Sequence, residues 1–232
     1  MTKALNELAV LKKSHSSITV HENSHPFTEC ATWADDYKGT YSFQAGWHFI
    51  DQPYLDKGGD LSDYSFTPDA YHIVDALTNL TNWLKNSGTA YKSSYYYKEI
   101  MQSFPNEADA RSVALRLIIH YVGDIHQPLH TVSEVDSTYK SGDRGGNSET
   151  LPSKDGVTNL HGVWDSVAYS YTGYPTLPLS SSDWTWYGTE SATMAKSYPT
   201  SSSELHDGNF NLWAQEGLAL AKTTVYPGKL IF

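Results

Sequence analysis

The stretch LIIHYVGDIHQPLH, residues 117–130, decides the fold class, because its apolar residues predict a long buried helix. Apolar positions from Val113 to Val122 cover most of the circumference of that helix, as expected of a central one. His120 and Asp124 interrupt the apolar run four residues apart. On a helix this spacing puts both side chains on one face, about 5–6 Å apart. An imidazole and a carboxylate on one face of a buried helix are difficult to explain by packing alone.

A second pair with the same spacing, His161 and Asp165, lies in the segment NLHGVWD. One such pair taken alone is more often a packed histidine with a structural hydrogen bond than a metal site. Two pairs favour a metal site instead, together with His130, which lies just beyond the Pro128 that is expected to end the helix. Imidazole nitrogens and carboxylate oxygens are ligands that Zn²⁺ accepts where no thiolate is available.

Apolar residues recur at helical spacing along the chain, and no segment shows sustained alternation, so we expect an all-α protein with long functional loops. Thr67 before Pro68 is expected to cap one helix, and Asn106 after Pro105 another. The helices are expected at residues 4–13, 26–37, 67–88, 106–126, 159–169, 189–198 and 205–226. Loops are expected at residues 14–24, 39–59 and 172–186, and a long loop or weak hairpin at residues 131–160.

Length and composition set limits on the class of protein. A chain of 232 residues with 39% hydrophobic residues suits one domain with a sizeable core. The balance of 16 Lys and Arg against 26 Asp and Glu gives a net charge of −10, which argues against a nucleic-acid binder that relies on a basic patch. Cys30 is the one cysteine, so an intramolecular disulfide is excluded. No run of 18 apolar residues occurs, so no membrane-spanning helix is expected.

Five motifs in order resemble the S1/P1 nuclease family. The segments that carry the resemblance are ATWADDYK at 31–38, WHFID at 47–51, HYVGDIHQPLH at 120–130, DRGGN at 143–147 and NLHGVWD at 159–165, with WAQE at 213–216 downstream. Members of that family are secreted, mostly helical enzymes with three zinc ions that cut single-stranded DNA and RNA and remove 3′-phosphates. The resemblance implies a single phospholipase C/P1 nuclease-like helical domain over residues 1–232.

The resemblance also implies the metal ligands, all of them His or Asp. Asp35, His48 and His120 correspond to the ligands of one zinc ion; His130, His161 and Asp165 to those of a second; and Asp124 to a carboxylate shared between the first zinc and a third. Three zinc ions would supply the positive charge that a phosphate group needs in an acidic protein.

The remaining site residues also follow from the resemblance. Asp35 and Lys38 are the candidate catalytic residues, with Lys38 as a cation beside the phosphate; alternatively Lys38 is a solvated lysine at a helix end. Phe49 and Asp51 correspond to a nucleobase pocket that suits an unpaired strand, although Phe49 could instead be core and Asp51 a turn residue. Asn147, in a glycine-rich turn, is a further substrate contact, or part of a plain turn. His126 and Gln127 are interpreted as supporting or structural residues.

The chain departs from the family pattern at both ends. We find no counterpart of the family's amino-terminal Trp and His ligands before Asp35, and none of its last helix after the Val225-Tyr226 pair, so two zinc sites are better supported than three. No leader segment is recognised, although the resemblance implies an extracellular or secretory location and Asn79-Leu80-Thr81 forms a glycosylation sequon.

Three functions are therefore weighed. The first is a zinc-dependent endonuclease acting on single-stranded DNA, RNA and nucleotides, giving 5′-phosphate products without a membrane or an obligate protein partner. The second is a non-catalytic zinc-binding or nucleotide-binding member of the family. The third is a zinc phospholipase C.

Overall fold

The computed structural model describes residues 2–171, 175–197 and 208–228. Within these residues the ordered backbone is mainly helical, and the four strands are only three to five residues long, so the expected helical class is confirmed. The chain divides into two compact units, which are described separately. Unit 1 comprises Met1–Phe43, Asn79–His120 and Pro175–Asn209, and unit 2 comprises Gln44–Thr78, Tyr121–Tyr174 and Phe210–Phe232.

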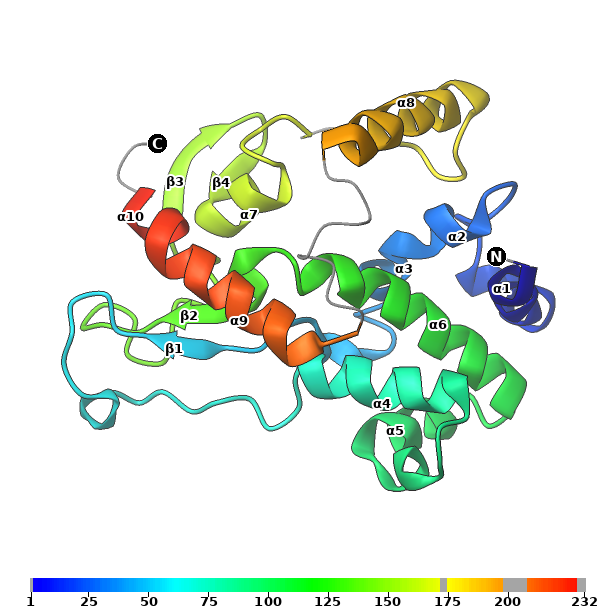
Figure 1. The fold of residues 1–232 in the computed structure, drawn as a ribbon, viewed down its shortest axis with the longest axis horizontal. Helices are drawn as coiled ribbons and strands as arrows, with labels where there is room; N and C mark the ends of the chain where they lie inside the picture. The colour runs from blue at the N-terminus through cyan, green and yellow to red at the C-terminus, as the bar shows by residue number, and fades with distance from the viewer. Residues whose placement is uncertain (1, 172–174, 198–207, 229–232) are drawn as a thin grey trace. The chain divides into compact units, whose positions relative to one another are not determined.

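Unit 1 is built from helices (Figure 1). They are α1 (Thr2–Ser14), α2 (Pro26–Glu29), α3 (Trp33–Asp36), the later part of α4 (Ile73–Lys85), α5 (Tyr95–Ser103), α6 (Glu107–Asp124) as far as His120, and α8 (Ser181–Ser197). Asn106 begins α6 as expected, since its Oδ1 accepts hydrogen bonds from the N–H groups of Ala108 (2.9 Å) and Asp109 (3.2 Å).

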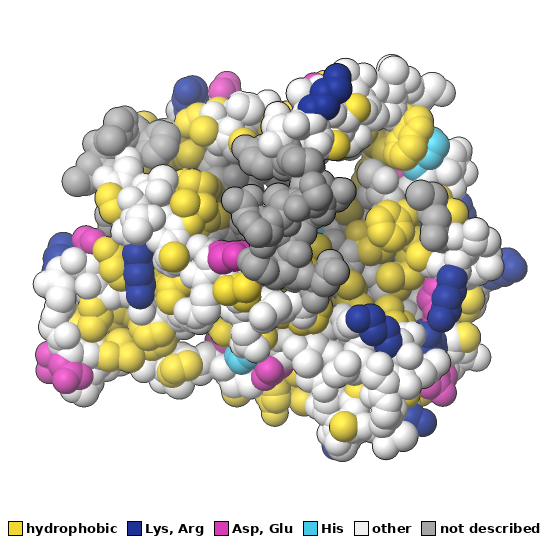
Figure 2. All heavy atoms as spheres, viewed as in Figure 1, with side chains coloured by type: hydrophobic (Ala, Val, Ile, Leu, Met, Phe, Trp, Pro, Cys, Tyr) yellow, Lys and Arg dark blue, Asp and Glu magenta, His cyan; other side chains and the backbone are white. Residues whose placement is uncertain are grey.

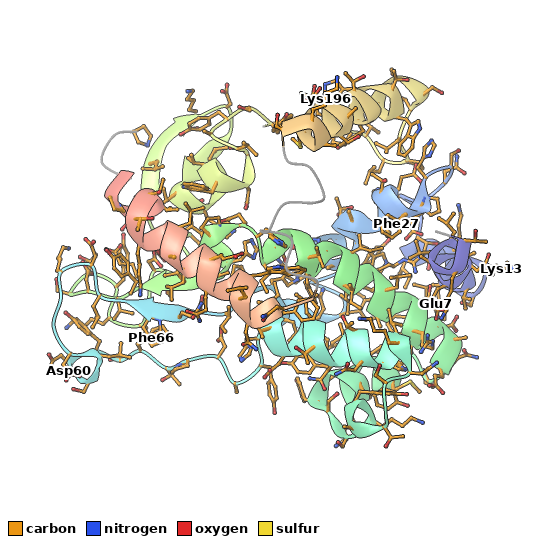
Figure 3. All side chains as sticks on the ribbon, in the orientation of Figure 1. Glu7, Lys13, Phe27, Asp60, Phe66 and Lys196 are labelled. Carbon is orange, nitrogen blue, oxygen red and sulfur yellow. The ribbon has the colours of Figure 1, made fainter. Side chains whose placement is uncertain are left out.

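A fully buried arginine fixes α6 within unit 1. The Arg116 guanidinium donates to both carboxylate oxygens of Glu22, at 2.8 and 2.6 Å, and to the Leu8 carbonyl at 3.1 Å. A buried charge is tolerated only when it is paired and its donors are used, and both conditions are met here. A second pair at the edge of the unit joins Arg111 to Glu7, which is labelled on α1 in Figure 3. These contacts hold the helix that carries His120 against the amino-terminal segment.

Unit 2 combines short strands with helices. Strand β1 (Gln52–Tyr54) pairs in parallel with β2 (Val132–Glu134), and β3 (Thr150–Lys154) pairs antiparallel with β4 (Val157–Asn159). A 3₁₀ helix (Ser42–His48) precedes β1 and another, η6 (Pro128–His130), precedes β2. Helix α7 (Leu160–Asp165) follows β4, and α9 (Phe210–Leu220), a π-helical turn (Ala221–Val225) and α10 (Tyr226–Gly228) complete the unit.

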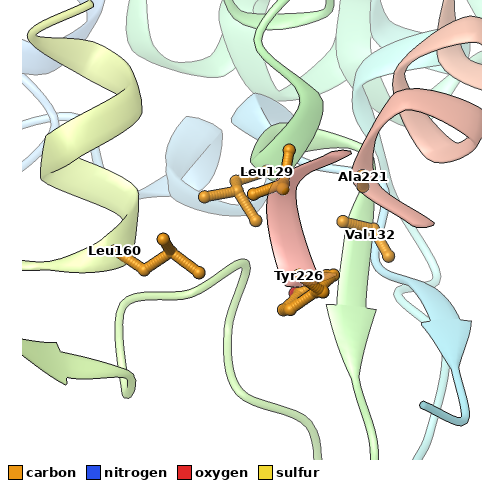
Figure 4. Close-up of a cluster of buried hydrophobic side chains, with 6 residues drawn as sticks. Leu129, Val132, Leu160, Ala221 and Tyr226 are labelled. Carbon is orange, nitrogen blue, oxygen red and sulfur yellow. The ribbon is translucent and has the colours of Figure 1, made fainter. Parts of the chain in front are cut away.

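The core of unit 2 joins segments that are far apart in sequence (Figure 4). Its buried members are Leu129, Val132, Leu160, Ala221, Val225 and Tyr226. The π-helical turn places both Ala221 and Val225 in this core. The Tyr226 hydroxyl, at the start of α10, donates to Asp143 Oδ2 at 2.9 Å. The start of α10 thereby contacts the loop that contains the DRGGN motif.

Several element boundaries differ from the expectation. Helix α4 begins at Ile73 rather than at Thr67, because the His72 carbonyl and ring nitrogen cap its first turn; the Ala76 N–H bonds to that carbonyl at 2.9 Å. Helix α7 ends at Asp165 rather than near Tyr169, because residues 167–169 adopt left-handed backbone with φ of 49°, 52° and 69°.

Other segments were expected as loops but are ordered. Helix α8 already begins at Ser181, where Ser180 and Asp183 cap each other: Asp183 N–H bonds to Ser180 Oγ at 3.1 Å and Ser180 N–H to Asp183 Oδ2 at 3.2 Å. Residues 39–59 contain the 3₁₀ helix and β1, and α5 was not expected. The β3–β4 pair is the weak hairpin expected within residues 131–160. Residues 198 and 205–207, which were expected in helices, lie outside the described residues.

None of the helices in the described ranges has the length and the apolar content needed to cross a lipid bilayer.

Candidate metal centre

His130, His161 and Asp165 form a group within unit 2. His130 ends η6, whereas His161 and Asp165 lie one turn apart on α7. The Nε2 atom of His161 lies 3.3 Å from Asp165 Oδ2, and that of His130 lies 4.0 Å from Asp165 Oδ1. Each of the three residues offers one ligand atom, and these three atoms all lie within 4.8 Å of one another. Such a spacing allows all three residues to bind one ion.

Backbone carbonyls fix the tautomer of both histidines in this group. His161 Nδ1 lies 2.8 Å from the Gly145 carbonyl, and His130 Nδ1 lies 2.9 Å from the His48 carbonyl. Since a carbonyl only accepts, each Nδ1 must carry the proton, and the Nε2 lone pair is left for a metal. Burial lowers the pKa of His130, which also favours the neutral ring.

The glycine-rich loop that holds His161 depends on Asp143. This buried carboxylate accepts from the Glu134 N–H (2.9 Å), the Gly146 N–H (3.0 Å) and the Tyr226 hydroxyl (2.9 Å). Gly145 adopts a left-handed φ of 60°, and a Cβ there would lie 2.1 Å from the Leu129 carbonyl oxygen. The sequence indicated the glycines but not the role of Asp143, whose Tyr226 partner is too distant along the chain to be found from local pattern.

Gln127 orients Asp165. Its amide nitrogen donates to Asp165 Oδ1 at 2.9 Å, and its amide oxygen accepts from the Leu129 N–H at 2.6 Å. The second contact fixes which end of the amide faces Asp165. With Oδ1 engaged, Oδ2 is the oxygen that faces His161.

Replacing Gln127 with methionine is expected to lower the affinity of the His130–His161–Asp165 group for zinc by about 10–100-fold. Methionine is similar in length but donates no hydrogen bond, so the Asp165 carboxylate is free to rotate. Zinc titration by competition with a chromophoric chelator measures the affinity. Gln215→Met, which breaks the exposed hydrogen bond of Gln215 to Gln52, is the matched control. Equal zinc affinity in both variants would contradict this role.

A second pair in unit 2 joins His48 and Asp124. His48 Nδ1 lies 2.9 Å from Asp124 Oδ2, and His48 Nε2 lies 2.8 Å from Gln44 Oε1. The Tyr121 hydroxyl donates to the same Gln44 oxygen at 2.8 Å. Because the Gln44 oxygen accepts the hydrogen of His48 Nε2, the other ring nitrogen, Nδ1, which faces Asp124, is the one that can bind a metal. Gln44 and Tyr121 were not identified from the sequence.

The remaining pair of expected ligands lies in unit 1. Asp35 Oδ2, on α3, lies 3.6 Å from His120 Nε2, on α6. His120 Nδ1 lies 2.6 Å from the Ala31 carbonyl, so this ring also leaves Nε2 for a metal. The Lys38 ammonium contacts Asp35 Oδ1 at 2.9 Å, which places a cation beside the carboxylate.

Three expected substrate contacts lie in unit 2. The Phe49 ring stacks on the His130 ring, with centroids 4.5 Å apart and planes 3° from parallel. Asp51 Oδ1 is buried and has no hydrogen-bond partner among the described residues. Burial, then Asp69 and Asp143, raise the pKa of Asp51 to about 7, against an opposing effect of Arg144. Asn147 donates its amide hydrogen to the Arg144 carbonyl at 2.9 Å, within its own turn.

The raised pKa of Asp51 predicts a pH-dependent stability of the metal-free protein. The folded-state pKa of about 7 exceeds the ordinary value of 3.8, so the folded state retains a proton that the unfolded state loses. This stability is fully present below about pH 4 and is lost as the pH rises through about 7. The free energy of unfolding of Asp51→Asn, minus that of the original protein, should therefore increase from pH 4 to 7 and then level off. Urea titrations across this range would show it; a pH-independent difference would refute the assignment.

The donor set as a whole fits zinc. It contains no thiolate, and the histidines present ring nitrogens toward carboxylates while their other nitrogens are hydrogen-bonded. These features define a mainly helical protein with a His/Asp centre suited to divalent metal ions. The S1/P1 Nuclease family model matches residues 3–230, across both units, and the chain belongs to that family.

Individual relatives are nucleases from fungi and plants. Nuclease S1 of Aspergillus oryzae is 33% identical over 141 residues, which cover 59% of this chain and 39% of that protein. Endonuclease 2 of Arabidopsis thaliana is 30% identical over 142 residues (58% and 40%), and nuclease P1 of Penicillium citrinum 27% identical over 138 residues (59% and 42%). The matched part thus spans about two-fifths of the length of each relative.

Proposed function

We propose that this protein is a zinc-dependent nuclease that hydrolyses phosphodiester bonds of single-stranded DNA and RNA, gives 5′-phosphate products and removes 3′-phosphates. The observation that carries the proposal is the orientation of His120, His130 and His161. Each donates its Nδ1–H to a backbone carbonyl, which leaves Nε2 beside an aspartate. The family membership and the nuclease relatives support the same chemistry.

The proposed ligands follow the family resemblance. Asp35, His48 and His120 hold one zinc ion, His130, His161 and Asp165 a second, and Asp124 is shared with a third site. Zinc, when bound, would lower the pKa of a bound water, and its own positive charge would stabilise the phosphate oxygens. Gln127 holds Asp165, and the Gly145 carbonyl holds His161, so that the ligands need little rearrangement.

The proposed substrate contacts come from both units. Lys38, which is half-exposed beside Asp35, offers a positive charge for the transition state. Phe49, held parallel to His130, offers a ring on which any unpaired base can stack. Asp51 keeps one buried oxygen available for a base edge, and Asn147 adds a polar contact. An extracellular location, with Asn79 glycosylated, accompanies this proposal.

Zinc removal tests the proposed function directly. Digestion of single-stranded DNA should stop when EDTA strips the protein and return when zinc, but not magnesium, is restored, because the ligand set is rich in imidazole. Elemental analysis of the same samples counts zinc per chain. Zinc binding without turnover would favour a non-catalytic member of the family, and hydrolysis of a choline phosphodiester in place of DNA would favour a phospholipase.

A further inference from the structure

A cleft of about 590 Å³ lies in unit 2 beside the candidate metal ligands. Its polar lining comprises the candidate ligands Asp124, His130 and Asp165 together with His126 and Gln127. Its apolar wall consists of Pro128, Val163, Trp164, Val167, Ala168 and Leu220. Neither Phe49 nor Asp51 lines the cleft, but Phe49 stacks on His130, which does. The cleft therefore adjoins the contacts proposed above for one nucleobase without including them.

The two kinds of lining decide which part of a nucleotide suits each of them. The carboxylates of Asp124 and Asp165 would repel a phosphate unless a metal ion is bound there, so the phosphate must lie beside the candidate metal ligands. The apolar wall offers nothing to an ionic group, but it suits an uncharged ring and sugar. Volumes of about 300–1,000 Å³ are typical of sites for small organic ligands, and a nucleoside falls in that class.

Trp164 gives the wall a rigid aromatic surface. Its side chain is half-buried and packs against the unit 2 core, which restricts its motion. Val167 and Leu220, which also line the cleft, are 58% and 42% exposed, so they offer apolar surface to a ligand. The backbone of Val167 is left-handed, with a φ of 49°. This conformation costs a valine conformational free energy, so contacts of the surrounding segment must stabilise it.

We propose that this cleft binds a second nucleoside of the single strand, on the other side of the scissile phosphate from the base at Phe49, with Trp164 as the stacking surface. The proposal rests on the proposed function and extends it: the protein would recognise two adjacent nucleosides rather than one. Stacking on Trp164 selects for an unpaired base without selecting its identity.

Binding of slowly hydrolysed analogues tests the proposal on the zinc-loaded protein. Dithymidine phosphorothioate carries one nucleoside more than thymidine 3′-phosphorothioate, and calorimetry gives the affinity for each. The dinucleotide should bind about tenfold more tightly, and Trp164→Ala should remove most of this gain while leaving the affinity for the mononucleotide unchanged. Trp164→Phe should retain the gain, because a ring remains.

A second variant keeps the test independent of folding. Val167→Asn suits left-handed backbone better than valine does and is exposed, so this variant should fold. Its polar side chain should reduce the affinity advantage of the dinucleotide over the mononucleotide about threefold, because it makes the apolar wall more polar. Trp186→Ala, on α8 in unit 1 and 44% exposed, is the matched control and should change neither affinity.

The outcomes separate the two proposals. A dinucleotide that binds no more tightly than the mononucleotide would overturn the cleft assignment and leave the nuclease proposal standing. An equal loss in Trp186→Ala would also overturn it. Failure of the zinc-loaded protein to bind either analogue would overturn both proposals, because the phosphate would then have no site.

Discussion

Replacing Gly145 with alanine is expected to lower the free energy of unfolding by about 3 kcal/mol or more, the sum of left-handed strain and overpacking. The added Cβ would lie 2.1 Å from the Leu129 carbonyl oxygen, at a residue whose φ is 60°. The Leu129 oxygen belongs to the backbone, and the position of the Cβ is fixed by the backbone of residue 145, so the loop must move rather than a side chain. Because the Gly145 carbonyl accepts the His161 Nδ1 hydrogen, the movement should also weaken zinc binding. Urea denaturation and zinc content measure the two effects.

Gly156→Ala is the matched control for this prediction. Gly156 also has a positive φ, of 84°, but a Cβ there would meet no atom within 4 Å. Its substitution should cost only the backbone strain, about 1–2 kcal/mol, and leave zinc content unchanged. Equal destabilisation by the two substitutions would show that the close approach to Leu129 is relieved at little cost.

Replacing Asp124 with asparagine is expected to reduce the rate of cleavage of single-stranded DNA at least about a thousandfold. Asparagine preserves the shape of the side chain but removes the negative charge that faces His48 Nδ1 at 2.9 Å and lies 3.9 Å from His130 Nδ1. In the proposed function, this charge holds divalent ions together near the phosphate of the substrate. Initial rates at saturating zinc, with zinc per chain measured in parallel, test the prediction.

Asp155→Asn controls for the loss of one acidic residue. Asp155 is exposed, lies between β3 and β4, and has a φ of 51° that asparagine tolerates. Its substitution should leave both the rate and the zinc content unchanged. Retention of more than about a tenth of the activity by Asp124→Asn would contradict a shared ligand role, since loss of a metal-bound charge costs far more than that.

The parts of the fold that were predicted from the sequence depend on short-range chemistry. Asn106 beside Pro105 marks the start of α6 through its own hydrogen bonds, and the apolar run predicts its burial. The spacing of His161 and Asp165 is likewise a property of one helical turn. Side chains four residues apart are placed by the helix itself, so no tertiary information is needed.

The parts that were missed depend on contacts across the chain. Strand β1 pairs with β2 at a sequence separation of 80 residues, as Gln52 opposite Val132 shows, and a three-residue strand carries too weak a pattern to be detected. Thr67 and Pro68 satisfy the local rules for a helix start, yet α4 begins at Ile73, whose N–H bonds to the Phe49 carbonyl. The local preference was outweighed by a distant partner.

The hydrogen bond between Tyr226 and Asp143 has a consequence for synthesis of the protein. Because synthesis proceeds from the amino terminus, the proposed ligands His130, His161 and Asp165 leave the ribosome well before Tyr226 does. During that interval the loop at residues 143–147 lacks the hydrogen bond that the Tyr226 hydroxyl donates to Asp143. The side chains of Leu129, Val132 and Leu160 likewise stay uncovered until Ala221 and Val225 have been synthesised. We therefore expect unit 2 to acquire its full metal affinity only after Tyr226 has left the ribosome, and any metal ion bound earlier to be released readily.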